Sequence, residues 1–307
     1  MPSKAIFSGI MAPMVTPVDE KFSIDHRALE RLINHMIEGG IHGIFILGTT
    51  GEASSLSYAQ RKELIKSSGH FINNRVPFWV GITDTSFQES VELANFASQY
   101  GAAAVVAAPP FYIPIAQSEL IYYYQYLANA CKLPLYLYNF PSLTKIEIAP
   151  ETVKQLSAHP NIWGIKDSSN NIEYLKKLLA LDLKKPFNWL LGPEAILCDS
   201  LAMGAHGGVN GGANLFPKLY VKAYDIFRNG TSQQKATFQK LINLVGSTVF
   251  KESYPNAFFL KGLKAALAAE NICENFMMLP LQPYDSKTES EIIESVKAIK
   301  DQLALEL

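Results

Sequence analysis

The sequence lacks the features that mark several classes of protein. Its 3 cysteines among 307 residues lie far apart, and none forms a CxxC or Cys/His pattern. A disulfide framework and a zinc site of the usual spacing are therefore excluded, and we expect no metal ligand set. The 27 basic and 28 acidic residues give a net charge of −1. Because no cationic excess exists to bind phosphates, we expect neither nucleic acid nor a membrane as a partner.

Targeting and membrane-spanning signals are also missing. The first residues, MPSKAIFSG, show no basic segment followed by an apolar one. An uncharged stretch covers residues 93–118, but Pro109, Pro110 and Pro114 would interrupt a spanning helix. We therefore expect a cytoplasmic protein.

A regular alternation of short apolar runs and longer amphipathic segments fills most of the chain. The runs are apolar at consecutive positions, as in strands covered on both faces. They are Gly9–Val15, Gly43–Leu47, Pro77–Ile82, Ala103–Ala108, Leu133–Tyr138, Asn161–Lys166, Asn188–Leu191 and Gly207–Asn210. Strand–helix units repeated over this length predict an α/β protein, a (β/α)8 TIM barrel over residues 1–228. An open doubly wound sheet is the alternative, weakened because no G-x-G-x-x-G or Walker pattern follows a strand.

Capping residues predict where individual helices begin. Asp25 precedes an apolar stripe that ends at Gly39–Gly40, Ser57 opens a capping-box pattern, and Asn170 is a candidate cap for a helix starting near residue 172. Pro150 suits a first helical turn.

The alternation stops after residue 228, and the remaining chain is predicted to be helical over 231–248, 256–270 and 287–304. The last of these helices carries one apolar side, formed by Ile292, Ile293, Val296, Ile299 and Leu303. We interpret residues 229–307 as a C-terminal helical extension packed on the barrel in one structural unit.

Chemistry in TIM barrels is carried by residues at the carboxyl ends of the strands. The second strand ends in the motif GTTGE at Gly48–Glu52. Its glycines permit tight turns, and its free N–H groups with the hydroxyls of Thr49 and Thr50 can bind a small anion such as a carboxylate. A plain strand–helix turn with a capping threonine is the alternative interpretation.

Two further strand ends carry reactive side chains. Lys166 ends the sixth apolar run, where desolvation would favour the free amine that attacks carbonyl groups. Tyr138 ends the fifth, where a phenol can transfer protons. The 28 residues between them correspond to one strand–helix unit, which places both side chains on adjacent strands. A salt bridge from Lys166 to Asp167 and a purely structural role for Tyr138 are the alternatives.

Taken together, GTTGE at 48–52, YNFP at 138–141 and GIKD at 164–167 resemble the pyruvate-dependent class I aldolase and lyase family. That family includes dihydrodipicolinate synthase, N-acetylneuraminate lyase and the aldolases of 2-keto-3-deoxy sugar acids. The resemblance extends along nearly the whole chain and includes PPFY at 109–112, the segment 204–214 and the segment 255–261.

The resemblance implies specific roles for these residues. Lys166 would form an imine with the 2-oxo carbon, and Tyr138 would move protons. Thr49 and Thr50 would hold the pyruvate carboxylate, and Tyr112 matches a tyrosine that a neighbouring subunit lends to the proton relay. It further implies a homo-oligomer, a dimer or tetramer, that needs no metal or other cofactor.

Some positions bear on the choice of substrate. Dihydrodipicolinate synthases usually carry arginine where this chain has Leu143, which cannot bind the carboxylate of aspartate semialdehyde. Glu194 and Asn210 can bind sugar hydroxyls, although Ala195 replaces the second acidic residue of neuraminate lyases. Ser168 and Val209, at the ends of their strands, complete the expected substrate contacts.

We therefore expect a Schiff-base-forming lyase that reversibly cleaves a 2-keto-3-deoxy sugar acid, or a related 4-hydroxy-2-oxo acid, to pyruvate and an aldehyde. Open alternatives are 4-hydroxy-tetrahydrodipicolinate synthesis, neuraminate cleavage and dehydration of a 2-keto-3-deoxy acid. A barrel that binds a 2-oxo acid without turning it over is the alternative from a different class.

Overall fold

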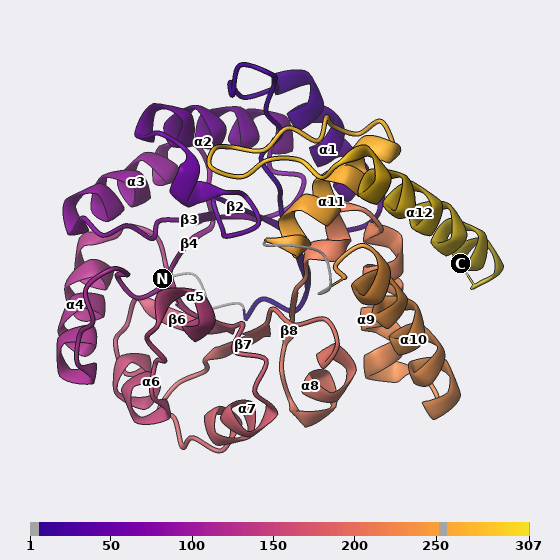
Figure 1. Cartoon of the computed structure of the whole chain (residues 1–307). Coiled ribbons are helices and arrows are strands. Elements are labelled where there is room, and N and C mark those ends of the chain that lie inside the picture. The colour runs from indigo at the N-terminus through magenta and orange to yellow at the C-terminus, as the bar shows by residue number, and fades with distance from the viewer. Residues whose placement is uncertain (1–5, 252–256, 307) are drawn as a thin grey trace.

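The strands of the protein close into a parallel barrel. A computed structural model describes residues 6–251 and 257–306 (Figure 1). Each strand pairs with the next in sequence, and β8 pairs in parallel with β1 through Gly9 and Gly207. The strands are β1 (Gly9–Pro13), β2 (Gly43–Ile46), β3 (Phe78–Gly81), β4 (Ala104–Ala107), β5 (Leu135–Asn139), β6 (Ile162–Asp167), β7 (Asn188–Leu191) and β8 (Gly207–Val209). The barrel prediction is confirmed, and the open sheet is wrong because the β1–β8 pairing leaves no edge.

Helices form a ring outside the barrel, which explains why the strands are apolar on both faces (Figure 1). The ring consists of α1 (His26–Glu38), α2 (Tyr58–Ile72), α3 (Phe87–Gln99), α4 (Gln117–Ala130), α6 (Pro150–Ser157), α7 (Ile172–Leu179), α8 (Leu197–Met203) and α9 (Pro217–Asn229). The short elements η1 (Ala53–Ser55), α5 (Pro141–Thr144) and η2 (Gly211–Asn214) follow strands β2, β5 and β8.

Most predicted helix starts are confirmed. The Asp25 carboxylate accepts from the N–H of Ala28 at the start of α1, and Ser57 forms a reciprocal capping box with Gln60. The cap predicted at Asn170 is wrong. Asn171 caps α7 by accepting from two N–H groups, whereas Asn170 has a positive φ of 55° and forms part of the preceding turn.

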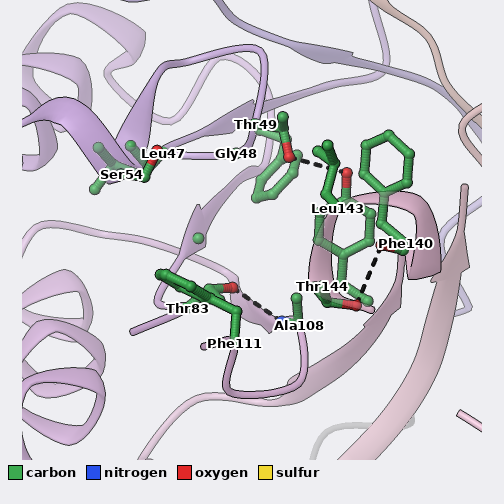
Figure 2. A pocket seen from close by; sticks show the side chains of 14 residues that line it. Leu47, Gly48, Thr49, Ser54, Thr83, Ala108, Phe111, Phe140, Leu143 and Thr144 are labelled. Atoms are coloured by element: carbon green, nitrogen blue, oxygen red, sulfur yellow. Dashed lines mark hydrogen bonds between the residues drawn. The ribbon is translucent and has the colours of Figure 1, made fainter. Parts of the chain in front are cut away.

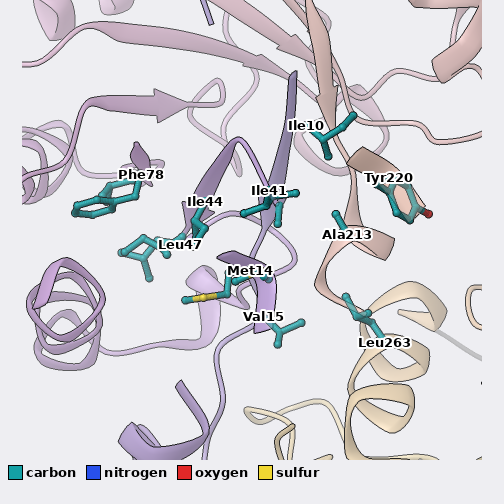
Figure 3. Packing of buried hydrophobic residues seen from close by; sticks show 14 of the residues in the cluster. Ile10, Met14, Val15, Ile41, Ile44, Leu47, Phe78, Ala213, Tyr220 and Leu263 are labelled. Carbon is teal, nitrogen blue, oxygen red and sulfur yellow. The ribbon is translucent and has the colours of Figure 1, made fainter. Parts of the chain in front are cut away.

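The C-terminal extension consists of α10 (Ser232–Thr248), α11 (Phe258–Ala269) and α12 (Ser286–Glu306). Leu263 of α11, Ala213 of η2 and Val15, which follows β1, belong to one continuous apolar core (Figure 3). The extension therefore shares the apolar core of the barrel. Residues 255 and 256, which begin the segment matched to the family, lie outside the described residues.

The apolar side predicted for the last helix needs one correction. Ile292, Val296, Ile299 and Leu303 are buried on α12, but Ile293 is 51% exposed. The helical period of 3.6 residues turns the neighbour of a buried residue away from the core. Within the described ranges, the structure contains no helix with the length and apolar character needed to cross a membrane.

Candidate active site

The predicted juxtaposition of Tyr138 and Lys166 is present at the carboxyl end of the barrel. They are direct register partners on β5 and β6. The Lys166 Nζ lies 4.0 Å from the centre of the Tyr138 ring and 5.2 Å from that of Phe45. Lys166 is only 5% exposed. Aromatic faces therefore surround the amine, and Tyr138 is its nearest ring.

The alternative partner, Asp167, is engaged elsewhere. Its carboxylate accepts from the Asn139 side-chain amide at 2.8 Å and from the N–H and hydroxyl of Ser169. Burial raises the pKa of Asp167, and these hydrogen bonds oppose that rise. Among the described residues, no carboxylate lies within ion-pair distance of Lys166. The amine is therefore not neutralised by a salt bridge.

The Gly48–Glu52 loop brings a hydroxyl to the same place. The Thr49 Oγ1 lies 3.3 Å from the Tyr138 hydroxyl, and the two form a hydrogen bond (Figure 2). Thr50, next in the loop, is buried. The loop lies so close to β3 that a Cβ on Gly81 would collide with the Leu47 carbonyl oxygen. Only glycine at position 81 lets the loop reach Tyr138 in this way.

A cavity of about 280 Å³ opens beside this pair. Its wall combines hydroxyl groups with apolar and aromatic surface, and among the described residues it has no charged side chain (Figure 2). The lining residues are Phe45, Leu47, Gly48, Thr49, Ala53, Ser54, Gly81, Thr83, Ala108, Phe111, Tyr138, Phe140, Leu143 and Thr144. Lys166 is not one of them, but its Nζ lies within 5.2 Å of the ring centres of two of them, Phe45 and Tyr138.

Leu143 sits on the rim of this cavity. It belongs to α5, which starts at Pro141 directly after the tyrosine motif, and its side chain faces the cavity near Phe140 (Figure 2). The residue is 51% exposed. The cavity rim is therefore apolar at this position.

Two polar residues expected to contact substrate lie outside the cavity wall. The Glu194 carboxylate accepts from the Gly212 N–H at 2.8 Å and from the Tyr220 hydroxyl. Burial raises its pKa to about 7. Asn210 is fully buried and donates from its amide to the Gly192 carbonyl at 3.0 Å. Both side chains thus bind the protein's own backbone.

The remaining expected contacts are also set back from the cavity. Val209 is buried inside the barrel with Tyr138. The Ser168 side chain packs against Gly192 at the ends of β6 and β7. Neither lines the cavity within the part of the chain that the structure describes.

Tyr112 does not line the cavity of its own chain. It is 93% exposed and has a positive φ of 88°, whereas its neighbour Phe111 lines the cavity.

Sequence reasoning missed several lining residues, notably Phe45, Ser54 and Thr83. The Thr83 hydroxyl accepts from the Ala108 N–H at 2.9 Å and so joins the ends of β3 and β4. Its position two residues beyond β3 was an available signal, because strand ends form the site in this fold. Within the described residues, no group of three or more His, Cys, Asp or Glu side chains could hold a metal ion.

The fold and the site together define a class of protein. A buried lysine on β6, a tyrosine beside it on β5 and a hydroxyl-rich loop after β2 lie together at the carboxyl ends of the strands, where TIM-barrel enzymes carry their chemistry. The chain matches the dihydrodipicolinate synthetase family over residues 6–299. It belongs to that family and is an enzyme of its lyase and aldolase type.

Relatives of the chain include both proteins named as aldolases and dihydrodipicolinate synthases. The chain is 34% identical to the probable 2-dehydro-3-deoxy-D-pentonate aldolase YjhH of Escherichia coli K12, over 76% of this chain and 79% of the relative. The structure of dihydrodipicolinate synthase from Bacteroides thetaiotaomicron has a TM-score of 0.92 and 40% identity, covering 96% and 99% of the two chains. YagE of E. coli K12, solved with pyruvate, has a TM-score of 0.90 and 27% identity, covering 96% and 99%.

Proposed function

We propose that this enzyme cleaves a 2-keto-3-deoxy sugar acid, or a related 4-hydroxy-2-oxo acid, reversibly to pyruvate and an uncharged aldehyde. The observation that carries the proposal is the buried Lys166 amine facing the Tyr138 ring at 4.0 Å. Binding a 2-oxo acid without chemistry requires neither residue. The similarity to YjhH, named as an aldolase of such an acid, supports the same substrate class.

The reaction begins on Lys166. Its Nζ attacks the C2 carbonyl, and loss of water gives a protonated imine, which acts as an electron sink. Tyr138 then takes the proton of the C4 hydroxyl, and the C3–C4 bond breaks to release the aldehyde. The enamine left on Lys166 gains a proton at C3, and hydrolysis releases pyruvate. Because the imine supplies the electron sink, we propose that no metal or other cofactor takes part.

The loop of Thr49 and Thr50 is proposed to hold the pyruvate carboxylate. Its tight backbone presents N–H groups, and the hydrogen bond from Thr49 to the Tyr138 hydroxyl joins the carboxylate site to the proton-transfer group. The carboxylate and the C4 hydroxyl of the substrate would then both contact one network of protein hydroxyl groups.

The cavity wall is the basis for the choice of an uncharged aldehyde. Leu143, Phe111 and Phe140 offer no partner for a carboxylate, whereas the hydroxyls of Ser54 and Thr83 can bind those of a sugar. Losing the charge-assisted contact that an arginine would make to a substrate carboxylate should cost on the order of a few kcal/mol in transition-state binding. This wall disfavours aspartate semialdehyde, despite the overall similarity to dihydrodipicolinate synthases.

The same site suggests two alternative activities. Dehydration of a 2-keto-3-deoxy acid is the second candidate activity, because the dehydratases of such acids also form an imine. Their uncharged sugar chains would fit the same cavity wall. Neuraminate cleavage is less favoured because Glu194 and Asn210 are bound to the backbone rather than facing the cavity. We further propose a cytoplasmic homo-oligomer, a dimer or tetramer, in which Tyr112 of one subunit completes the site of another.

A screen of 2-keto-3-deoxy acids for pyruvate release tests this proposal, with Lys166→Ala as the control. We expect release from at least one uncharged sugar acid by the wild type and none by the variant. Condensation of pyruvate with aspartate semialdehyde as the main activity would contradict the proposed substrate class. Loss of water with the carbon chain intact would favour the dehydratase.

A further inference from the structure

A buried ion pair joins the Gly48–Glu52 loop to the C-terminal extension. The Lys264 Nζ of α11 lies 2.6 Å from Glu52 Oε1, and both side chains are only 1% exposed. These residues are 212 positions apart in the sequence, and neither takes part in the proposed chemistry. Burying two charges is expensive, so the pair is not explained by stability alone.

Both partners make a second contact with the extension. Glu52 Oε2 accepts from the Met278 N–H at 2.9 Å, and Lys264 Nζ donates to the Phe276 carbonyl at 2.6 Å. The carboxylate is therefore fixed by helix α11 and by the segment that follows it. The extension thus holds Glu52 at two points.

Glu52, which the extension holds, also has a backbone conformation that forms the turn of the Gly48–Glu52 loop. Glu52 has a positive φ of 52°, and its N–H donates to the Thr49 carbonyl at 3.0 Å. Thr49 in turn bonds to the Tyr138 hydroxyl. A continuous series of contacts thus runs from the Lys264 ammonium through Glu52 and Thr49 to the tyrosine beside Lys166.

We propose that Lys264 is a positioning residue, which acts through Glu52 to hold the carboxylate-binding loop in the geometry that a 2-oxo acid requires. This inference rests on the proposed function. It assigns to the helical extension a part in substrate affinity, although no residue of the extension lines the cavity in the described part of the chain. Loss of the Lys264 ammonium leaves a buried carboxylate without its counter-ion, and movement of the loop toward water would lower that cost.

The test compares Lys264→Met and Glu52→Gln with the wild type. Each protein is titrated with pyruvate and reduced with borohydride, and the labelled fraction is measured by mass spectrometry. We expect the half-saturating pyruvate concentration to rise at least tenfold in Lys264→Met and at least threefold in Glu52→Gln. Labelling at saturating pyruvate should stay near the wild-type level, because Lys166 is unchanged.

A matched control separates positioning from general destabilisation. Ile299→Ala creates a cavity under α12, a helix of the same extension that supplies none of the printed partners of the ion pair. Its half-saturating concentration should stay within twofold of the wild type, even where its melting temperature falls as far as that of Lys264→Met. If Lys264→Met does not fold, Glu52→Gln decides by its own threefold threshold.

The inference is overturned if the ion-pair variants titrate like the wild type or no differently from Ile299→Ala. In those cases wild-type labelling would leave the proposed function standing. A wild type that no concentration of pyruvate labels would overturn the proposed function and this inference together.

Discussion

Tyr138 and Lys166 are register partners on adjacent strands, and the amine of one lies 4.0 Å from the ring centre of the other. A parallel barrel brings consecutive strand ends together at one rim. The 28 residues between these two therefore become a side-by-side contact. The tyrosine hydroxyl also reaches Thr49 on a third strand end, so the site joins β2, β5 and β6.

Removal of the tyrosine hydroxyl tests its role as proton carrier. Tyr138→Phe keeps the ring over Lys166 but removes general acid–base catalysis, so we expect turnover to fall about 10²- to 10⁴-fold. Tyr136→Phe is the matched control on the same strand, because the Tyr136 hydroxyl bonds to Asn188 instead. Steady-state kinetics of both variants should show a loss only in the first. Comparable losses in both would mean that the effect comes from packing.

The side chain at position 143 is predicted to set the charge of the accepted aldehyde. Leu143→Arg places a guanidinium at the cavity rim, where it can pair with a carboxylate. We expect the ratio of kcat/KM for aspartate semialdehyde to that for a neutral aldehyde to rise at least tenfold. Leu143→Met, similar in volume and uncharged, should leave the ratio unchanged. An unchanged ratio in the arginine variant would contradict the proposed basis of selectivity.

Tyr112 is predicted to act in a neighbouring subunit. Its 93% exposure should fall when subunits associate, and Tyr112→Phe should lower turnover at least tenfold without dissociating them. Sedimentation analysis measures whether the subunits stay associated, and steady-state kinetics measures the turnover of the variant. The decisive measurement mixes Tyr112→Phe with Lys166→Ala: hybrid oligomers should regain activity, since each supplies the intact residue that the other lacks. A fully active monomer would rule out this role.

The raised pKa of Glu194 predicts a specific dependence of stability on pH. Burial lifts the pKa from 4.5 to about 7, so the fold favours the protonated carboxyl. Its stabilising contribution is complete below pH 4.5 and is lost as the pH rises through 7, by at most about 3 kcal/mol. Glu194→Gln should remove this part of the pH dependence. Melting temperatures between pH 5 and 8 measure it.

An exposed glutamate supplies the control for that experiment. Glu173 lies on the surface of α7 in an ion pair with Lys176, and Glu173→Gln should leave the slope of melting temperature against pH as in the wild type. An unaltered slope in Glu194→Gln would show that the carboxyl is already ionised at pH 5 in the folded protein.

Local sequence signals were enough to predict the barrel. Each apolar run overlaps a strand, and only β5 and β6 extend one residue beyond their runs, because a parallel barrel buries both faces of its strands. The caps at Asp25 and Ser57 were equally local. The failure at Asn170 shows the limit of such signals: two adjacent asparagines can both cap, and the path of the preceding turn selects Asn171.

Long-range contacts escaped prediction for a physical reason. Glu52 was visible as the end of a motif, but its partner Lys264 lies on a helix whose placement depends on tertiary packing. The orientation of Glu194 likewise depends on the Tyr220 hydroxyl and the Gly212 N–H, which reach it from other elements. Neither spacing nor residue type specifies where such side chains point.

The proposed reaction depends most directly on covalent imine formation at Lys166. The measurement is borohydride reduction in the presence of pyruvate, followed by peptide mapping of the labelled protein. We expect label at one site, Lys166, and no label in Lys166→Ala. Labelling confined to other lysines, or turnover of a 2-keto-3-deoxy acid that survives in Lys166→Ala, would contradict it.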